Sequence, residues 1–92
     1  MRPSRVKQRW AAGKAAFCTV VHLTDPSVAE LASLMGFDCL WFDLEHHATS
    51  VETAGQMMRG ARVGVSDVLA RPGKGEFMRM GRLLEAGAHG IL

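Results

Sequence analysis

The chain has 92 residues, which is enough for one small domain (residues 1–92) with a limited core. Hydrophobic residues make up 48% of the sequence, so the composition indicates a folded chain and excludes a disordered one. A formal net charge of +2 is too small to indicate nucleic-acid binding, and no apolar run approaches the ~20 residues of a membrane span. We expect a cytoplasmic protein with neither nucleic-acid nor membrane partners.

Hydrophobic periodicity predicts helices that alternate with strands along the whole chain. The predicted helices cover residues 4–12, 26–35, 50–62 and 76–86, and the predicted strands cover 16–23, 38–44, 67–70 and the stub 89–92. Alternation of this kind, with short connections, predicts a parallel sheet joined by right-handed crossovers.

Capping residues mark the starts of two helices. Asp25 followed by Pro26 is typical of an N-cap and first helical position. Thr49 and Glu52 have the spacing of a capping box. Apolar stripes predict which helix faces are buried: Val6 and Trp10 in the first helix, Val28, Leu31, Ala32 and Met35 in the second, and Phe77, Met80, Leu83 and Leu84 in the last.

The two cysteines, Cys18 and Cys39, fall inside predicted strands and lack the spacing of a CxxC motif. We expect both to be buried thiols in a reducing compartment.

A polar cluster follows the second strand directly. The apolar run ends at Asp43, and Glu45, His46 and His47 come next. Ligands of parallel α/β folds bind at the carboxyl ends of strands, so this cluster is the best candidate for chemistry. We expect Asp43 to orient the His46 imidazole and His47 to point elsewhere; the alternatives are that His46 is an ordinary surface histidine and that Asp43 only caps the turn.

Two more residues are predicted at the carboxyl edge of the sheet, which we call the rim. Arg71 ends the third strand and could clamp a carboxylate, unless it is a surface arginine beside a proline. His22 lies near the end of the first strand. The segment Gly73-Lys74-Gly75 lacks the spacing of a phosphate-binding loop. Glu85 falls in the last turn of a helix, where the helix dipole mildly disfavours a negative charge; the alternative is an ordinary solvated glutamate.

Three blocks of this sequence resemble the HpcH/HpaI aldolases, which are class II, metal-dependent pyruvate aldolases that include the 2-dehydro-3-deoxyglucarate aldolases. The blocks are Gly-Phe-Asp-Cys-Leu-Trp-Phe-Asp-Leu-Glu-His, Val-Leu-Ala-Arg-Pro and Leu-Leu-Glu-Ala-Gly-Ala-His-Gly-Ile. The family fold is a (β/α)8 TIM barrel of typically ~250 residues. The resemblance therefore implies the N-terminal part of such a barrel, with three βα units and the start of a fourth strand.

The resemblance also implies roles for individual residues. His46 falls on the family's general base, Asp43 on the aspartate paired with it, and Arg71 on the arginine that binds the pyruvate carboxylate and keto oxygen. Glu85 falls on an acidic residue that supports the site. The family's divalent metal (Mg, Mn or Co) takes its ligands from later strands, so this chain is expected to contain none of them and to have little activity alone.

The expected function is reversible aldol cleavage of a 2-keto-3-deoxy acid into pyruvate and an aldehyde, by a homo-oligomer of which this chain is a fragment. Two alternatives stay open. One is a citrate-lyase-like or malyl-CoA-lyase-like enzyme, and the other is a non-catalytic half-barrel that pairs with another chain.

Overall fold

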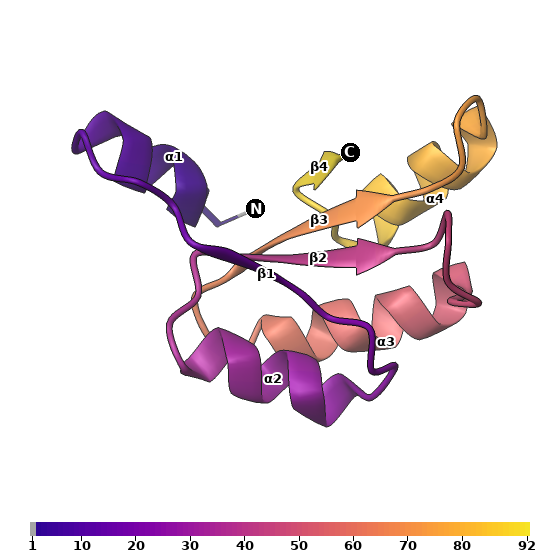
Figure 1. The fold of residues 1–92 in the computed structure, drawn as a ribbon, viewed down its shortest axis with the longest axis horizontal. Coiled ribbons are helices and arrows are strands. Elements are labelled where there is room, and N and C mark those ends of the chain that lie inside the picture. Colours follow the sequence, from indigo (N-terminus) through magenta and orange to yellow (C-terminus); the bar gives the residue numbers. More distant parts are fainter. Residues whose placement is uncertain (1) are drawn as a thin grey trace.

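A computed structural model describes residues 2–92 and confirms the alternation of helices and strands (Figure 1). In chain order the elements are α1 (Arg5–Ala11), β1 (Cys18–Val20), α2 (Pro26–Leu34), β2 (Cys39–Asp43), α3 (Val51–Ala61), β3 (Asp67–Arg71), α4 (Phe77–Ala86) and β4 (Gly90–Ile91). The Asp25 cap is confirmed, since its carboxylate accepts a hydrogen bond from the Ser27 N–H at 2.8 Å. The cap of α3 is Ser50 rather than Thr49, because Ser50 directly precedes the first helical residue and accepts from the Thr53 N–H.

The four strands form one sheet in the order β1-β2-β3-β4, and every neighbouring pair is parallel. Because all four strands are parallel, their carboxyl ends lie at the same edge of the sheet. Strand β1 covers Cys18–Val20 and is shorter than the predicted range of residues 16–23. The last hydrogen bond of its ladder with β2 runs from the Val21 N–H to the Trp41 carbonyl. The carboxyl edge of this sheet carries the residues that end β2 and β3.

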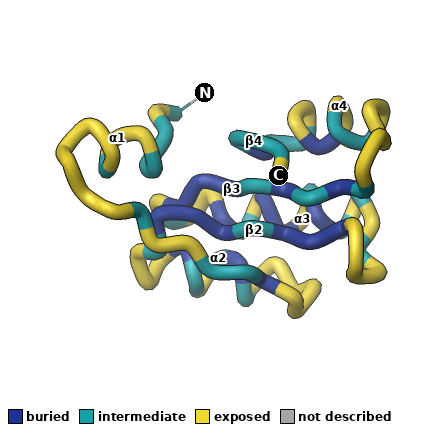
Figure 2. The backbone as a smooth tube through the Cα atoms, turned by 45° about the horizontal axis from the view of Figure 1, so that its top comes forward, coloured by how far each residue is buried: buried dark blue, intermediate teal, exposed yellow. Residues whose placement is uncertain are grey.

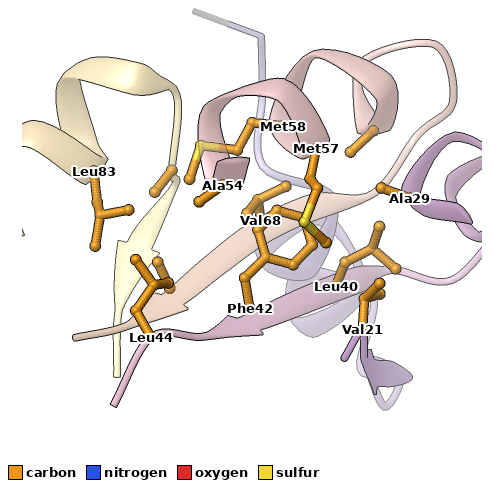
Figure 3. Close-up of a cluster of buried hydrophobic side chains, with 13 residues drawn as sticks. Val21, Ala29, Leu40, Phe42, Leu44, Ala54, Met57, Met58, Val68 and Leu83 are labelled. Atoms are coloured by element: carbon orange, nitrogen blue, oxygen red, sulfur yellow. The ribbon is translucent and has the colours of Figure 1, made fainter. Parts of the chain in front are cut away.

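The main core lies between the sheet and the helices α2, α3 and α4 (Figure 3). Alternate residues of β2 and β3 point into it, and the largest of these, Phe42, is fully buried. Burying a side chain of this size contributes roughly 1.5–3 kcal/mol relative to leaving it exposed. The labelled members of the cluster in Figure 3 are Val21, Ala29, Leu40, Phe42, Leu44, Ala54, Met57, Met58, Val68 and Leu83.

Small residues let α2 and α3 approach each other closely. A Cβ added at Gly60 would collide with the Pro26 carbonyl, and one added at Gly64, beyond the end of α3, would collide with Ser33. The Ser33 hydroxyl is fully buried and donates to the Ala61 carbonyl at 2.6 Å. The buried face of α2 is therefore its small-residue face.

The predicted apolar stripes are only partly right: Leu83 is fully buried as predicted, whereas several other large residues of the stripes are exposed. Leu31 in α2 and Met35, the C-cap of that helix, are 60% and 69% exposed. In α1 Trp10 is 64% exposed, and in α4 Phe77 is 78% exposed. Figure 2 shows the burial concentrated in β2 and β3, with α1 and the loops largely exposed. Cys18 is exposed too, not buried as predicted, because it lies on the edge strand β1.

Two buried aspartates anchor α1 at the amino end of the sheet. The Asp67 carboxylate accepts from the Ser4 hydroxyl and from the N–H groups of Arg5 and Val6 at 2.6–3.0 Å. Asp38 accepts from the Arg5 guanidinium at 2.9 Å. These charges hold the N-terminal helix in place and leave the carboxyl edge of the sheet free of it. Nowhere between residues 2 and 92 does a helix have the length and apolar character required to cross a membrane.

Candidate active site

The site at the carboxyl edge is built on a pair of charged residues from adjacent strands. Asp43 ends β2, Arg71 ends β3, and the two are register partners in the parallel ladder. The guanidinium grips the carboxylate at two points: Arg71 Nε donates to Asp43 Oδ1 at 3.1 Å, and Nη2 donates to Oδ2 at 2.7 Å. A fork-to-fork pair of this kind fixes both the position and the plane of the arginine. The predicted placement of Arg71 on the same rim as the β2 cluster is confirmed.

Asp43 also holds the backbone of the loop that follows β2. Its Oδ1 accepts from the Glu45 N–H at 3.0 Å and from the His46 N–H at 3.2 Å. The carboxylate is nearly inaccessible to solvent, with a side chain 2% exposed. The hydrogen bonds from Arg71 hold the pKa of the Asp43 carboxyl well below its usual range. Asp43 is therefore a charged anchor at neutral pH, and the turn-capping alternative describes part of what it does.

Arg71 keeps a solvent-facing edge although it is tightly held. Its Cζ lies 4.7 Å from the centroid of the Trp41 ring, so the guanidinium stacks on an aromatic face. Its Nε is 3.6 Å from Glu45 Oε1, and the hydrogen bond to Asp43 raises the pKa of Arg71 further. The Arg71 side chain is 32% exposed, and within residues 2–92 its Nη1 has no hydrogen-bond partner. The free Nη1 edge can donate hydrogen bonds to a second carboxylate, for example that of a bound ligand.

The two histidines of the loop are arranged differently from the prediction. His46 is bound to Asp43 through its backbone, and its imidazole Nε2 lies 3.1 Å from Glu45 Oε1 with the side chain 71% exposed. The imidazole that approaches Asp43 is that of His47, whose Nε2 is 3.7 Å from Oδ2. The carboxylate that positions the His46 ring is thus Glu45 rather than Asp43, because the Asp43 oxygens are taken up by Arg71 and by the loop amides.

His47 was not expected near the site, and its place follows from His22. The rings of His22 and His47 stack with centroids 3.9 Å apart and an interplanar angle of 28°. This contact brings the loop after β1 against the loop after β2, and it places His22 on the rim as predicted. The contact between His22 and His47 can be predicted from the sequence only if the loops after β1 and β2 are known to lie at the same edge of the sheet.

Glu85 does not join this group. It lies at the end of α4, where it borders a hollow with Arg2, Arg62 and His89. His89 directly precedes β4, and its Nδ1 accepts from the Val68 N–H near the start of β3. Since α4 runs back from the end of β3 to the start of β4, Glu85 lies at the amino end of the sheet. The structure therefore gives it no contact with the Asp43–Arg71 pair.

The described residues do not form a metal site. Across residues 2–92 no three His, Cys, Asp or Glu side chains are grouped so that they could hold a metal ion. Asp43, the most buried carboxylate of the rim, already has its oxygens occupied by Arg71. A hollow of about 650 Å³ lies beside the rim between the starts of α3 and α4, and Ser50, Glu76, Phe77 and Arg82 are among its lining residues.

No family model matches the chain, but individual relatives do. A hydroxypyruvate/pyruvate aldolase from Pseudomonas aeruginosa is 32% identical over 89 residues, which are 97% of this chain and 33% of that protein. The crystal structure of an HpcH/HpaI aldolase from Desulfitobacterium hafniense matches with a TM-score of 0.83 and 26% identity, covering 94% of this chain and 34% of the other. The crystal structure of the citrate synthase SbnG matches with a TM-score of 0.84 and 26% identity, covering 94% and 35%.

The chain spans about a third of the length of each of these relatives. Its four parallel strands and their helices correspond to the N-terminal part of the aldolase TIM barrel, so the predicted fold class is confirmed. The resemblance that the three sequence blocks indicated is confirmed as well.

Proposed function

We propose that this chain, which resembles the HpcH/HpaI aldolases along nearly its whole length, supplies the keto-acid-binding corner of a pyruvate aldolase site. The observation that carries the proposal is the Asp43–Arg71 pair at the carboxyl edge. An arginine whose plane is fixed by a buried carboxylate and an aromatic ring is prepared to bind a second carboxylate through its remaining N–H groups. A 2-keto acid offers that carboxylate together with an adjacent keto oxygen.

The expected substrate pose follows from the open edge of Arg71. The substrate carboxylate and keto oxygen would accept hydrogen bonds from the Nη1 side, while Asp43 keeps the Nε side. The positive charge would then lie close to the keto oxygen on which negative charge develops during carbon–carbon cleavage. Trp41 and Asp43 prevent the guanidinium from turning away, so little order has to be gained on binding.

His46 is the proposed proton-transfer group. Glu45 Oε1 lies 3.1 Å from its Nε2, and a proton held there leaves Nδ1 free as the base. In aldol cleavage the base removes the proton of the substrate's 4-hydroxyl, and the C3–C4 bond breaks to release the aldehyde. Its electrons pass into the enolate of pyruvate, which takes a proton at C3. The His46 ring is exposed, and Glu45 Oε1 lies 3.1 Å from its Nε2 and 3.6 Å from Arg71 Nε, so a shared neighbour places the base beside the proposed substrate-binding arginine.

Residues 2–92 do not offer the grouped ligands that the divalent metal implied by the resemblance would need. We therefore propose keto-acid binding for the 92-residue chain itself, and aldol cleavage only in a longer barrel.

Pyruvate binding to the ¹⁵N-labelled chain tests the proposal by NMR titration. We expect saturable shifts at the amides of Leu44, Glu45 and His46, and a loss of affinity of about tenfold or more in Arg71→Met. Arg71→Lys keeps the positive charge but loses the planar set of N–H donors of the guanidinium, so it should weaken pyruvate binding to an intermediate extent. Lys74→Met removes a nearby cation outside the site and serves as the control. Equal affinity in Arg71→Met and wild type would refute the proposal.

A carbon–carbon bond-forming synthase is the second candidate, because the fold matches the citrate synthase as closely as it matches the aldolase. Citrate carries more carboxylates than pyruvate does. If citrate displaces pyruvate from the Arg71 site and binds more tightly, the synthase is favoured. Binding of neither ligand favours the non-catalytic half-barrel.

A further inference from the structure

Cys18 and Cys39 lie directly opposite each other in the sheet. They are register partners in the parallel pair β1–β2, and Asp67 of β3 continues the same row. Leu40, the next residue of β2, points into the helix-covered core, so alternation directs Cys39 to the other face. Cys18 borders a hollow of about 280 Å³ on that face, together with Trp10, Asp67 and Leu69.

The spacing of the two strands suits a covalent link. Neighbouring strands lie roughly 4.7–4.9 Å apart, and a disulfide needs Cα atoms about 4.4–6.8 Å apart. Burial raises the pKa of the Cys39 thiol and the neighbouring Cys18 raises it further, so the two thiols interact and Cys39 keeps its proton until it reacts. Both cysteines are free thiols in the structure.

The two thiols differ sharply in access. Cys18 is exposed, whereas Cys39 is 0% exposed. An oxidant dissolved in water can therefore meet Cys18 but not Cys39, while Cys39 is held next to whatever forms on Cys18. This is the arrangement of an attacking cysteine beside a resolving one.

We propose that Cys18 and Cys39 are an oxidation site at which a hydroperoxide forms an intrachain cross-strand disulfide. The Cys18 thiolate attacks the peroxide: the S–O bond forms, the O–O bond breaks, and the released hydroxide (or alkoxide) takes up a proton. The Cys39 sulfur then attacks the Cys18 sulfenic acid, forming the S–S bond and expelling hydroxide, which takes the Cys39 proton to become water. With hydrogen peroxide, two thiols and one peroxide give one disulfide and two waters.

The linkage would fasten β1, the three-residue edge strand, to the central strand β2 and close the loop that contains α2. Strand β1 leads into the loop with His22, and β2 carries Trp41 and Asp43, so the disulfide would join the two strands that position these residues.

Oxidation of the intact chain with hydrogen peroxide tests the proposal. Mass spectrometry should show a loss of about 2 Da, titratable thiols should fall from two to none, and dithiothreitol should reverse both changes. Trypsin has no site between Lys14 and Arg59, so a protease that cleaves after Glu30 is needed to separate the cysteines. The peptides containing Cys18 and Cys39 should then stay linked until reduction.

Single variants complete the experiment. In Cys18→Ser the Cys39 thiol should stay reduced in peroxide, and in Cys39→Ala oxidation should stop at the sulfenic acid or go on to the sulfinic acid of Cys18. Because Cys39→Ala leaves a space in a buried row and could unfold the chain, the wild-type peptide map decides the question. Chains linked to each other through Cys18, or Cys18 oxidised to sulfinic acid without an intrachain link in the wild type, would overturn the proposal.

Discussion

The Asp43 carboxylate and the Arg71 guanidinium meet at two hydrogen-bonded points, 3.1 and 2.7 Å long, where adjacent parallel strands end. The same carboxylate receives the first two N–H groups that point back from the loop after β2. One buried charge thus sets the position of the arginine and the path of the histidine loop.

Replacing Asp43 by Asn should lower the free energy of unfolding at neutral pH. It should also make the loss of stability at acid pH less steep. The depressed pKa of Asp43 means that the folded state binds its proton less readily than the unfolded state, whose pKa is about 3.9. The stabilisation is present above that value and is lost as pH falls below it. Circular dichroism from pH 5 down to pH 2 should show a shallower loss in Asp43→Asn. The remaining slope belongs to Asp38 and Asp67, whose pKa values are also lowered. An unchanged acid profile would mean that the pair contributes nothing.

His89 should make the chain more stable as pH rises toward about 6.5. Burial lowers its pKa, and its Nδ1 accepts from the Val68 N–H at 3.0 Å, which requires that nitrogen to be unprotonated. The unfolded state therefore binds the proton more tightly, so protonation favours unfolding. Urea unfolding in steps from pH 5 to 7.5 should show this rise. His89→Asn keeps an acceptor and removes the titration, so its stability should be flat over the range; a rise of the same size in both proteins would assign it to another group.

The residues that begin and end helices, together with the alternation of helices and strands, predict the fold from the sequence. The same alternation predicts which residues lie at the ends of the strands. Asp25 and Gly87 delimit helices as expected, with Gly87 at a φ of 125°. Parallel strands bring their carboxyl ends to one edge, so Arg71 and Asp43 had to be neighbours on the rim once both strands were recognised. Their direct pairing follows from register, which is a tertiary property.

The sequence could not show which imidazole turns toward Asp43. His46 and His47 differ by one position in a loop whose path is set by hydrogen bonds to the carboxylate itself. Nor could helical spacing show that α2 buries Ala29 and Ser33 in preference to Leu31, because that choice depends on the close approach of α3 at Gly60.

Two glycine-to-alanine substitutions should have opposite effects on stability. At Gly60 a Cβ would meet the Pro26 carbonyl, so Gly60→Ala should push α2 from α3 and cost about 1–3 kcal/mol. Gly81 lies in α4 with open space around its Cβ position, so Gly81→Ala should gain about 0.5–1 kcal/mol from helix propensity. Urea unfolding of the two variants beside wild type measures both. Similar effects at the two sites would show that α2 and α3 are not in tight contact.

His46 and His47 can be separated by activity in a longer barrel. A chimera would carry this chain in place of the matching third of the Pseudomonas aeruginosa aldolase. We expect His46→Ala to lower aldol cleavage by about 10²–10⁴-fold, the usual contribution of a positioned base. His47→Ala should have a smaller effect, since its ring stacks on His22 and approaches Asp43. Arg71→Ala should impair keto-acid binding as well as turnover. If the His46 variant keeps full activity while the His47 variant loses it, the base has been assigned to the wrong histidine.

The 92-residue chain should self-associate or unfold at modest temperature. Within residues 2–92 each of the edge strands β1 and β4 pairs on one side only, and an open strand edge is a template for another chain. Large apolar side chains lie exposed near β1 and at the chain's end, among them Phe17 at 64% and Leu92 at 56%. Neither edge strand contains a charged residue that would oppose pairing.

Size-exclusion chromatography with light scattering, run over a range of concentrations, tests the expectation directly. Wild type should elute as oligomers or as a concentration-dependent mixture. Val20→Lys places a charge on the β1 edge and should shift the distribution toward monomer, while Lys7→Gln in the exposed helix α1 should leave it unchanged. A wild-type monomer at every concentration that melts in one sharp transition would show that the open edges do not recruit a second chain, and that these residues form a self-sufficient unit.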